Sequence, residues 1–143
     1  MKRLAMLVGM LATQVALASD VKIEQAWMRA TAPGQEVAGA FMNITSAVDA
    51  RLVGVSSPVA GTVQLHSMSM NQGVMEMREM KNITLPRHKT IRLGPGGLHI
   101  MLFDLKQGMK PGDVVPLMLD IETAAHHHEK IDVKVEVRDL GGH

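Results

Sequence analysis

Histidine and methionine gather in the second half of the chain. Residues 66 to 77 read HSMSMNQGVMEM, and HIM follows at 99 to 101. Thioethers bind hard ions such as Mg²⁺ poorly and select Cu(I) in preference to Zn²⁺, whereas imidazole accepts several metals. Because both side-chain types are neutral as ligands, a bound ion would keep its full charge, which favours a monovalent cation. The sequence therefore predicts a soft Cu(I) site, with these candidate ligands: His66, Met77, His99 and Met101.

The HIM stretch has a direct structural interpretation on a β-strand. Residues at positions i and i+2 of a strand point to the same face of the sheet. We therefore expect His99 and Met101 to share the face of the site. Leu98, Ile100 and Leu102 should then face the core.

The hairpin that carries the other two candidates is less certain. His66 lies on the strand before the turn signal NQG at 71–73, and Met77 lies on the strand after it. They share a face only if the loop has an even number of residues or a strand carries a bulge. A simple three-residue loop would place them on opposite faces, so the metal site predicts the register of the hairpin.

The residues that other kinds of functional site require are missing from this sequence or wrongly placed in it. The chain has no cysteine, which excludes a thiol nucleophile, a CxxC redox pair and a blue-copper centre. Ser67 and Ser69 are close to His66 in sequence, but alternation places them on the other strand face, so a Ser–His nucleophile is not expected. The GPGG segment lacks the lysine of a phosphate loop. We expect a protein that is not an enzyme.

The remaining methionines have a simpler interpretation. Methionine adapts to irregular gaps and commonly fills protein cores. This role is expected for the following residues, which lie in strand-like runs: Met28, Met42, Met80 and Met118. Met68 and Met75 are either auxiliary ligands or part of an apolar rim around the site, and the rim is favoured.

The N-terminal segment reads as a secretory signal peptide. Lys2 and Arg3 precede the apolar run LAMLVGMLATQVALA, which closes with an A-x-A cleavage site. We expect a signal peptide at 1–18, one copper-binding domain at 19–143 and a periplasmic location. Without 1–18 the formal charge is 13 − 14 = −1, so neither nucleic acid nor an anionic membrane is an expected partner, and no later segment is apolar enough to span a membrane.

The elements that must position the candidate ligands are short strands. Runs such as RLVGVSS, LHIMLFDL, VVPLMLDIE and KIDVKVEVRDL are separated by Gly, Pro, Asn and Asp. Strands that recur about every ten residues, without a sustained 3.6-residue period, are typical of an all-β sandwich or barrel.

The spacing His-x10-Met-x21-His-x-Met resembles the signature of the PCuAC family of periplasmic copper chaperones. Further similar blocks are AWMRATAPGQEVAGAFMNIT and LGPGGLHIMLFDLKQGMKPGDVVPLMLDIE. The resemblance implies a cupredoxin-like, immunoglobulin-type β-sandwich that binds Cu(I). It also implies delivery of the copper, directly or through a thiol-bearing assembly factor, toward the CuA subunit of cytochrome oxidase or into envelope copper homeostasis.

Two features leave alternatives open. Members of that family often carry a His- and Met-rich C-terminal tail, whereas this chain ends in DLGGH and has His126, His127 and His128 at an expected hairpin turn. That triplet is interpreted mainly as a solvated turn, with a weaker secondary Cu(II) site as the alternative. The second open point is function: the protein could store copper for resistance instead of delivering it, or be a structural sandwich with incidental methionines.

Overall fold

The computed structural model describes residues 20–139, so the predicted signal peptide at 1–18 lies outside the described residues. No helix in this part of the chain is long and apolar enough to cross a membrane. The described elements are β1 (Val21–Arg29), β2 (Ala38–Ser46), β3 (Ala50–Ser56), β4 (Ala60–Asn71), β5 (Val74–Met80), β6 (Ile83–Leu85), β7 (Thr90–Leu93), β8 (His99–Leu105), β9 (Val114–Thr123), a 3₁₀ turn (Ala124–His126) and β10 (His127–Arg138).

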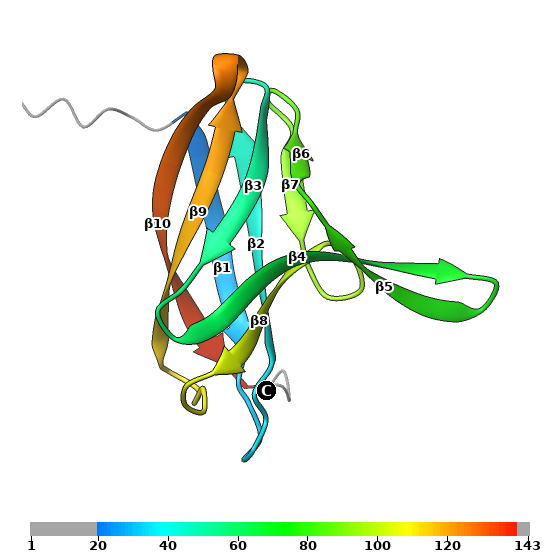
Figure 1. The fold of residues 1–143 in the computed structure, drawn as a ribbon, viewed down its shortest axis with the longest axis vertical. Helices are drawn as coiled ribbons and strands as arrows, with labels where there is room; N and C mark the ends of the chain where they lie inside the picture. Colours follow the sequence, from blue (N-terminus) through cyan, green and yellow to red (C-terminus); the bar gives the residue numbers. More distant parts are fainter. Residues whose placement is uncertain (1–19, 140–143) are drawn as a thin grey trace, which may run out of the picture.

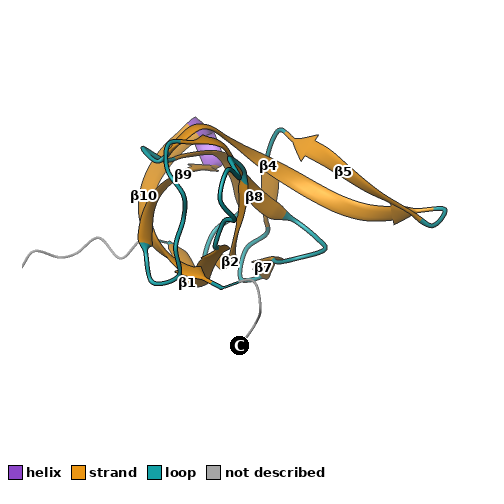
Figure 2. Cartoon of the chain, turned by 90° about the horizontal axis from the view of Figure 1, so that it is seen from below, coloured by secondary structure: helices purple, strands orange, loops and turns teal. Residues whose placement is uncertain are grey.

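The strands form one hydrogen-bonded sheet in the order β5-β4-β8-β2-β1-β10-β9-β3-β6, with β7 paired to β2. β1 and β10 are parallel, and the other named pairs are antiparallel. The sheet folds over, so that its strands surround a common interior (Figures 1 and 2). The prediction of an all-β sandwich is confirmed.

Period-two alternation builds the core. On β10, Val133, Val135 and Val137 are buried, and the residues between them are exposed. On β8, Ile100 and Leu102 are fully buried, as predicted. Each such side chain contributes about 1.5 to 3 kcal/mol by leaving water, so the core side of β8 holds the strand firmly in place.

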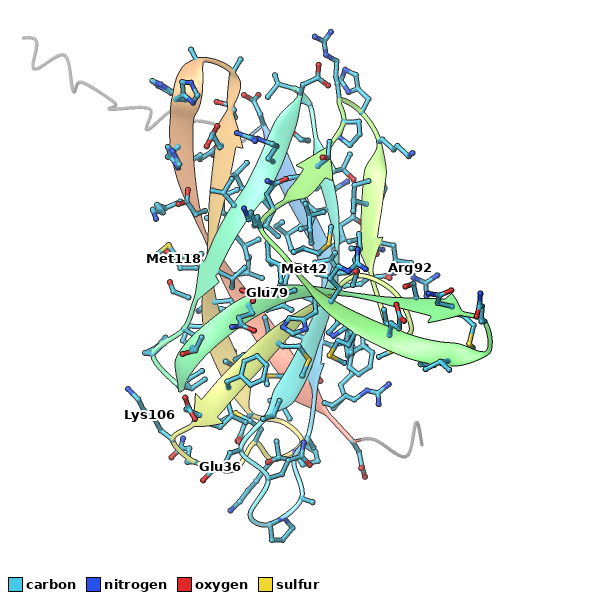
Figure 3. All side chains as sticks on the ribbon, turned by 45° about the vertical axis from the view of Figure 1, so that its right-hand side comes forward. Glu36, Met42, Glu79, Arg92, Lys106 and Met118 are labelled. Carbon is cyan, nitrogen blue, oxygen red and sulfur yellow. The ribbon has the colours of Figure 1, made fainter. Side chains whose placement is uncertain are left out.

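The core-filler prediction holds for three of the four methionines. Met28 and Met42 are buried, and Met80 packs against the core cluster. For Met118 the prediction is wrong. Its neighbours on β9, Leu117 and Leu119, point into the core, so alternation turns Met118 outward to a half-buried position (Figure 3).

A bulge in β1 reorients its last residues. Gln25 has a positive φ of 53°, and the pairing with β2 shifts between Glu24 and Trp27. Such a bulge changes which face the following residues occupy. It turns Met28 into the core and leaves Trp27 half-buried beside Phe41.

The hairpin of β4 and β5 extends out of the sandwich (Figure 1). β4 pairs with β8 only as far as His66, and from there to its end it pairs with β5 alone. We call residues 66–79 the arm. Its turn consists of Gln72 and Gly73, with φ of 50° and 80°, the pair of positive values that a type I′ hairpin turn requires.

Candidate metal centre

Two of the four predicted ligands are buried imidazoles. Among residues 20–139, the buried polar or charged side chains are Ser46, His66 and His99, and the histidines are 8% and 4% exposed. His66 on β4 pairs directly with His99 on β8, and their ring centroids are 5.8 Å apart. Burial of a polar group is costly unless it has a partner, so the partners of each ring nitrogen decide what the pair can do.

His99 has one ring nitrogen occupied and one free to bind. Its Nδ1 lies 2.9 Å from the carbonyl oxygen of Gly97. A carbonyl can only accept, so Nδ1–H donates, and the lone pair of the neutral ring is on Nε2. A backbone hydrogen bond of this kind commonly fixes the tautomer of a metal-binding histidine.

His66 has the opposite tautomer. Its Nε2 lies 2.9 Å from the side-chain oxygen Oε1 of Gln64, which accepts the Nε2–H and leaves the lone pair on Nδ1. That Nδ1 is buried and has no hydrogen-bond partner in the structure. Buried acceptors are rarely left without a partner, and a metal ion bound at Nδ1 would satisfy this one.

Gln64 therefore acts as the residue that orients His66. We expect Gln64→Leu to weaken Cu(I) binding by about 10- to 100-fold, the usual cost of losing a partner behind a ligand. Gln64→Glu should retain most of the affinity, because its carboxylate can accept the same hydrogen bond. Chelator competition measures both, and equal affinity in Gln64→Leu and the wild type would contradict this role.

The surroundings of His66 lower its pKa. Burial of the ring is the main cause, and the nearby charge of His99 acts in the same direction, whereas the carboxylate of Glu79 opposes both. Glu79, which is labelled in Figure 3, is the direct partner of His66 on the neighbouring strand β5. A lowered pKa keeps the ring neutral, the form that binds metal, in more acidic conditions than for a free histidine.

This shift predicts how the stability of the copper-free protein depends on pH. Below the ordinary pKa of about 6.5 the unfolded chain takes up a proton that folded His66 resists, so the free energy of unfolding falls as the pH drops from 7 and levels off below the folded-state pKa. Urea unfolding at pH 7.5 and 5.0 should show a smaller loss in His66→Leu than in the wild type. Equal losses of stability in the two proteins would contradict this prediction.

The pKa values of Asp120 and Glu122 are lowered from their already acidic values. These carboxylates therefore titrate below the pH range of the experiment.

The methionines approach the histidines from two strands. Asn71 pairs with Val74, so the loop has two residues, an even number, and the register is the one that the metal site requires. Met77 lies directly opposite Met68, on the face that carries His66. Met101 lies on β8 opposite Gly39 of β2.

A pocket of about 550 Å³ opens between these strands. Three of the predicted ligands line it, namely Met77, His99 and Met101. Met68 and Gly39 also line it. His66 is not part of the pocket wall and contacts the site through its ring beside His99. The structure thus brings the four candidates together, with His66 at the buried side and Met77, half-exposed at 50%, at the open side.

Aromatic rings shield the histidines. Phe103 lies 5.8 Å from His66 and Phe41 lies 6.4 Å from His99, measured between ring centroids. Trp27 packs on Phe41 with 4.7 Å between the ring centroids. The guanidinium carbon of Arg29 lies over the Phe41 ring, 5.6 Å from its centroid. The two histidines thus lie beside aromatic rings, whereas Met77 is half-exposed.

The histidine triplet does not join this site. His126 ends the 3₁₀ turn, and His127 and His128 begin β10, all three exposed, at the top of the sandwich in Figure 1. His128 bonds through Nδ1 to Asp120 at 2.9 Å. This agrees with a solvated turn, and the weaker Cu(II) site there stays a prediction.

Imidazoles and carboxylates alone do not make a metal centre here. Within residues 20–139 no group of three or more His, Cys, Asp or Glu side chains is placed to hold a metal ion. A metal at His66 and His99 would therefore depend on sulfur from methionine, which selects soft cations.

Sequence reasoning missed two residues of the site, Gln64 and Phe41. Gln64 is two positions before His66 on the same strand, so alternation could have placed it on the face of the site. Phe41 contacts His99 only because β2 pairs with β8, and no local pattern reveals that pairing.

Comparison with known proteins places the fold in one class. The copper-bound PCuAC domain from PmoF2 is 27% identical with a TM-score of 0.62, covering 83% of this chain and 94% of that one. The solution structure of CuI-DR1885 from Deinococcus radiodurans is also 27% identical with a TM-score of 0.62, covering 89% and 85%. The molecule is thus a PCuAC-type β-sandwich with the predicted cupredoxin-like, immunoglobulin-type fold.

Sequence comparison gives the family. The family model LpqE-like, described as "Putative lipoprotein LpqE-like", matches residues 21–137. "Putative lipoprotein Lxx21020" of Leifsonia xyli subsp. xyli is 31% identical over 126 residues, which cover 87% of this chain and 74% of that protein. The chain belongs to the LpqE-like family, which is the PCuAC family, and the predicted family resemblance is confirmed.

Proposed function

We propose that the protein is an exported, periplasmic chaperone that binds one Cu(I) ion through His66, Met77, His99 and Met101 and delivers it to a thiolate-bearing acceptor. The observation that supports it most is the pair of buried imidazoles, one with an unpartnered Nδ1, beside a pocket lined by methionine. Copper is the cargo of this reaction, and the protein acts as a carrier, not as an enzyme.

The ligand set suits a carrier. His99 Nε2 and His66 Nδ1 are fixed by Gly97 and Gln64 and would position the ion. The sulfurs of Met77 and Met101 are neutral, soft and nearer the opening, so they would exchange first. An acceptor with cysteine thiolates binds Cu(I) more strongly than thioethers do, and transfer would run toward it through a mixed-ligand intermediate.

The compartment favours this choice of ligands. Thiols in an oxidising envelope form disulfides, whereas oxidation of thioethers to sulfoxides is reversible by dedicated reductases. The relatives described as copper-bound support Cu(I) as cargo. The acceptors we propose are a thiol-bearing assembly factor or the CuA subunit of cytochrome oxidase, with envelope copper homeostasis as the wider role.

A transfer experiment tests the proposal. The protein, loaded anaerobically with one equivalent of Cu(I), is mixed with a peptide that carries a Cys-x-x-Cys pair, and copper on each partner is measured after separation. We expect one tight equivalent and its passage to the peptide. The Met77→Leu, Met101→Leu variant should lose Cu(I) affinity by at least about tenfold, or about 1.4 kcal/mol, and Met118→Leu serves as the control.

The outcomes separate the alternatives. Tight binding with retention of copper against the dithiol peptide would favour storage over delivery. Absence of a stoichiometric tight equivalent would favour a structural sandwich with incidental methionines. Unchanged affinity and transfer in the Met77→Leu, Met101→Leu variant would show that these sulfurs are not the exchanging ligands.

A further inference from the structure

The arm has two chemically different faces. Its cross-strand partners are Met70 with Met75, Met68 with Met77, and His66 with Glu79, and directly paired residues share a face. Since i and i+2 positions also share a face, all six side chains lie on one side. The other side carries Ser67 opposite Arg78 and Ser69 opposite Glu76.

Three of the four methionines of the arm are exposed, unlike the other methionines of the described chain. Met70 is 64% exposed, and Met75 and Met77 are each 50% exposed. Every other methionine within residues 20–139 is buried or half-buried. Met77 lines the pocket, and at Met68 the arm still donates a backbone hydrogen bond to Gly97 O. Strand pairing does not account for Met70 and Met75, because the arm pairs with no third strand there.

The sulfur-bearing face leads to the candidate metal centre. Met68 and Met77 both line the pocket that His99 and Met101 line. The Met70 and Met75 pair comes two positions further toward the turn at Gln72. Directly opposed residues have Cβ atoms about 4.5 to 5.5 Å apart, so two long thioether side chains can reach one ion between them.

We propose that the Met70–Met75 pair is a second, weaker Cu(I) site and that copper enters and leaves the histidine site through it, by way of Met68 and Met77. The ligand class is a soft monovalent cation, Cu(I) or Ag(I). Each step forms one metal–sulfur bond as another breaks, and no proton or electron is transferred, because the thioethers are neutral before and after. The inference rests on the proposed function for its direction of transfer.

Charge on this face favours the inward direction. Glu79 is the one charged residue among the six on the methionine face, and it lies at the base of the arm beside His66. Its negative charge acts on the His66 ring and raises the pKa of that ring, opposing the lowering by burial and by His99. The same charge would attract a cation from the tip toward the histidines.

The test removes sulfur and keeps apolar volume. In Met70→Leu, Met75→Leu we expect the tight Cu(I) equivalent to remain and the second, weaker equivalent to disappear. Stopped-flow transfer to a dithiol peptide should become about tenfold slower, equal to about 1.4 kcal/mol in the barrier. Met118→Leu, a half-buried methionine on β9, is the matched control and should transfer at the wild-type rate.

Two results would overturn the proposed path of copper through Met70 and Met75. One is an unchanged second equivalent and transfer rate in Met70→Leu, Met75→Leu. The other is a wild-type rate in that variant combined with a slow rate in Met70→Ser, Met75→Ser, which would make the face an apolar docking surface instead.

A direct measurement separates this inference from the proposed function. Methionine methyl NMR during Ag(I) titration of the His66→Leu, His99→Leu variant should still shift the Met70 and Met75 signals, because the tip pair does not require the histidines. If these methyls do not shift, the second site is wrong. If they shift but the wild type shows no tight Cu(I) equivalent, the tip site stands and the chaperone proposal fails.

Discussion

We expect the His66→Leu, His99→Leu double variant to lose tight Cu(I) binding while its copper-free form becomes no less stable than the wild type. Losing a partner behind a metal ligand already costs up to about 100-fold in affinity, and losing these two proposed ligands should cost more. Chelator competition under anaerobic conditions measures the affinity, and urea unfolding measures the stability.

The stability part follows from burial. Both rings are nearly inaccessible, and His66 Nδ1 lacks a partner. A buried polar group without a partner costs about 1 to 3 kcal/mol, so leucine at these positions should raise the free energy of unfolding by up to that amount. The empty site lowers the free energy of unfolding, and binding of the ion to the folded protein would raise it again. We expect this behaviour of a carrier.

The control changes a histidine that lies elsewhere. His127 is exposed at the start of β10, and His127→Leu should change neither the Cu(I) affinity nor the stability appreciably. A tight equivalent that persists in the double variant would exclude the two buried histidines as ligands.

Alternation along single strands made the central part of the site predictable. His99 and Met101 face the site and Ile100 and Leu102 are buried, because the period of two is a local property of any strand. The same rule, applied to β9, would have turned Met118 outward between Leu117 and Leu119. The error came from reading that methionine by residue type alone.

The arm shows where local reasoning stops. The register of His66 and Met77 depends on whether the turn has two or three residues. Gln72 adopts a positive φ that its residue type does not predict, so both registers were open. The hairpin extends beyond the sheet because β4 continues after its pairing with β8 ends at His66. Where that pairing ends is a long-range property.

Gly39 gives the second large effect, because it lies opposite Met101 and lines the pocket. A Cβ added at Gly39 would be 3.2 Å from Phe41 Cζ and 3.7 Å from Met101 Sδ. The methyl groups of valine would extend further into the pocket. We expect Gly39→Val to weaken Cu(I) binding by at least about tenfold, or about 1.4 kcal/mol, and to cost about 1 to 3 kcal/mol of stability through overpacking.

Gly54 on β3 provides the matched control, since a Cβ there would make an ordinary contact of 3.9 Å with Asp120 Cβ. Gly54→Val should bind Cu(I) like the wild type in the same chelator competition. Because Gly39 is not one of the proposed ligands, its effect would come from occupying the space of the ion, or from displacing the sulfur of Met101 or the ring of Phe41 beside His99. A Gly39→Val protein that folds and binds copper with wild-type affinity would therefore place the ion outside this pocket, whatever the histidine variants show.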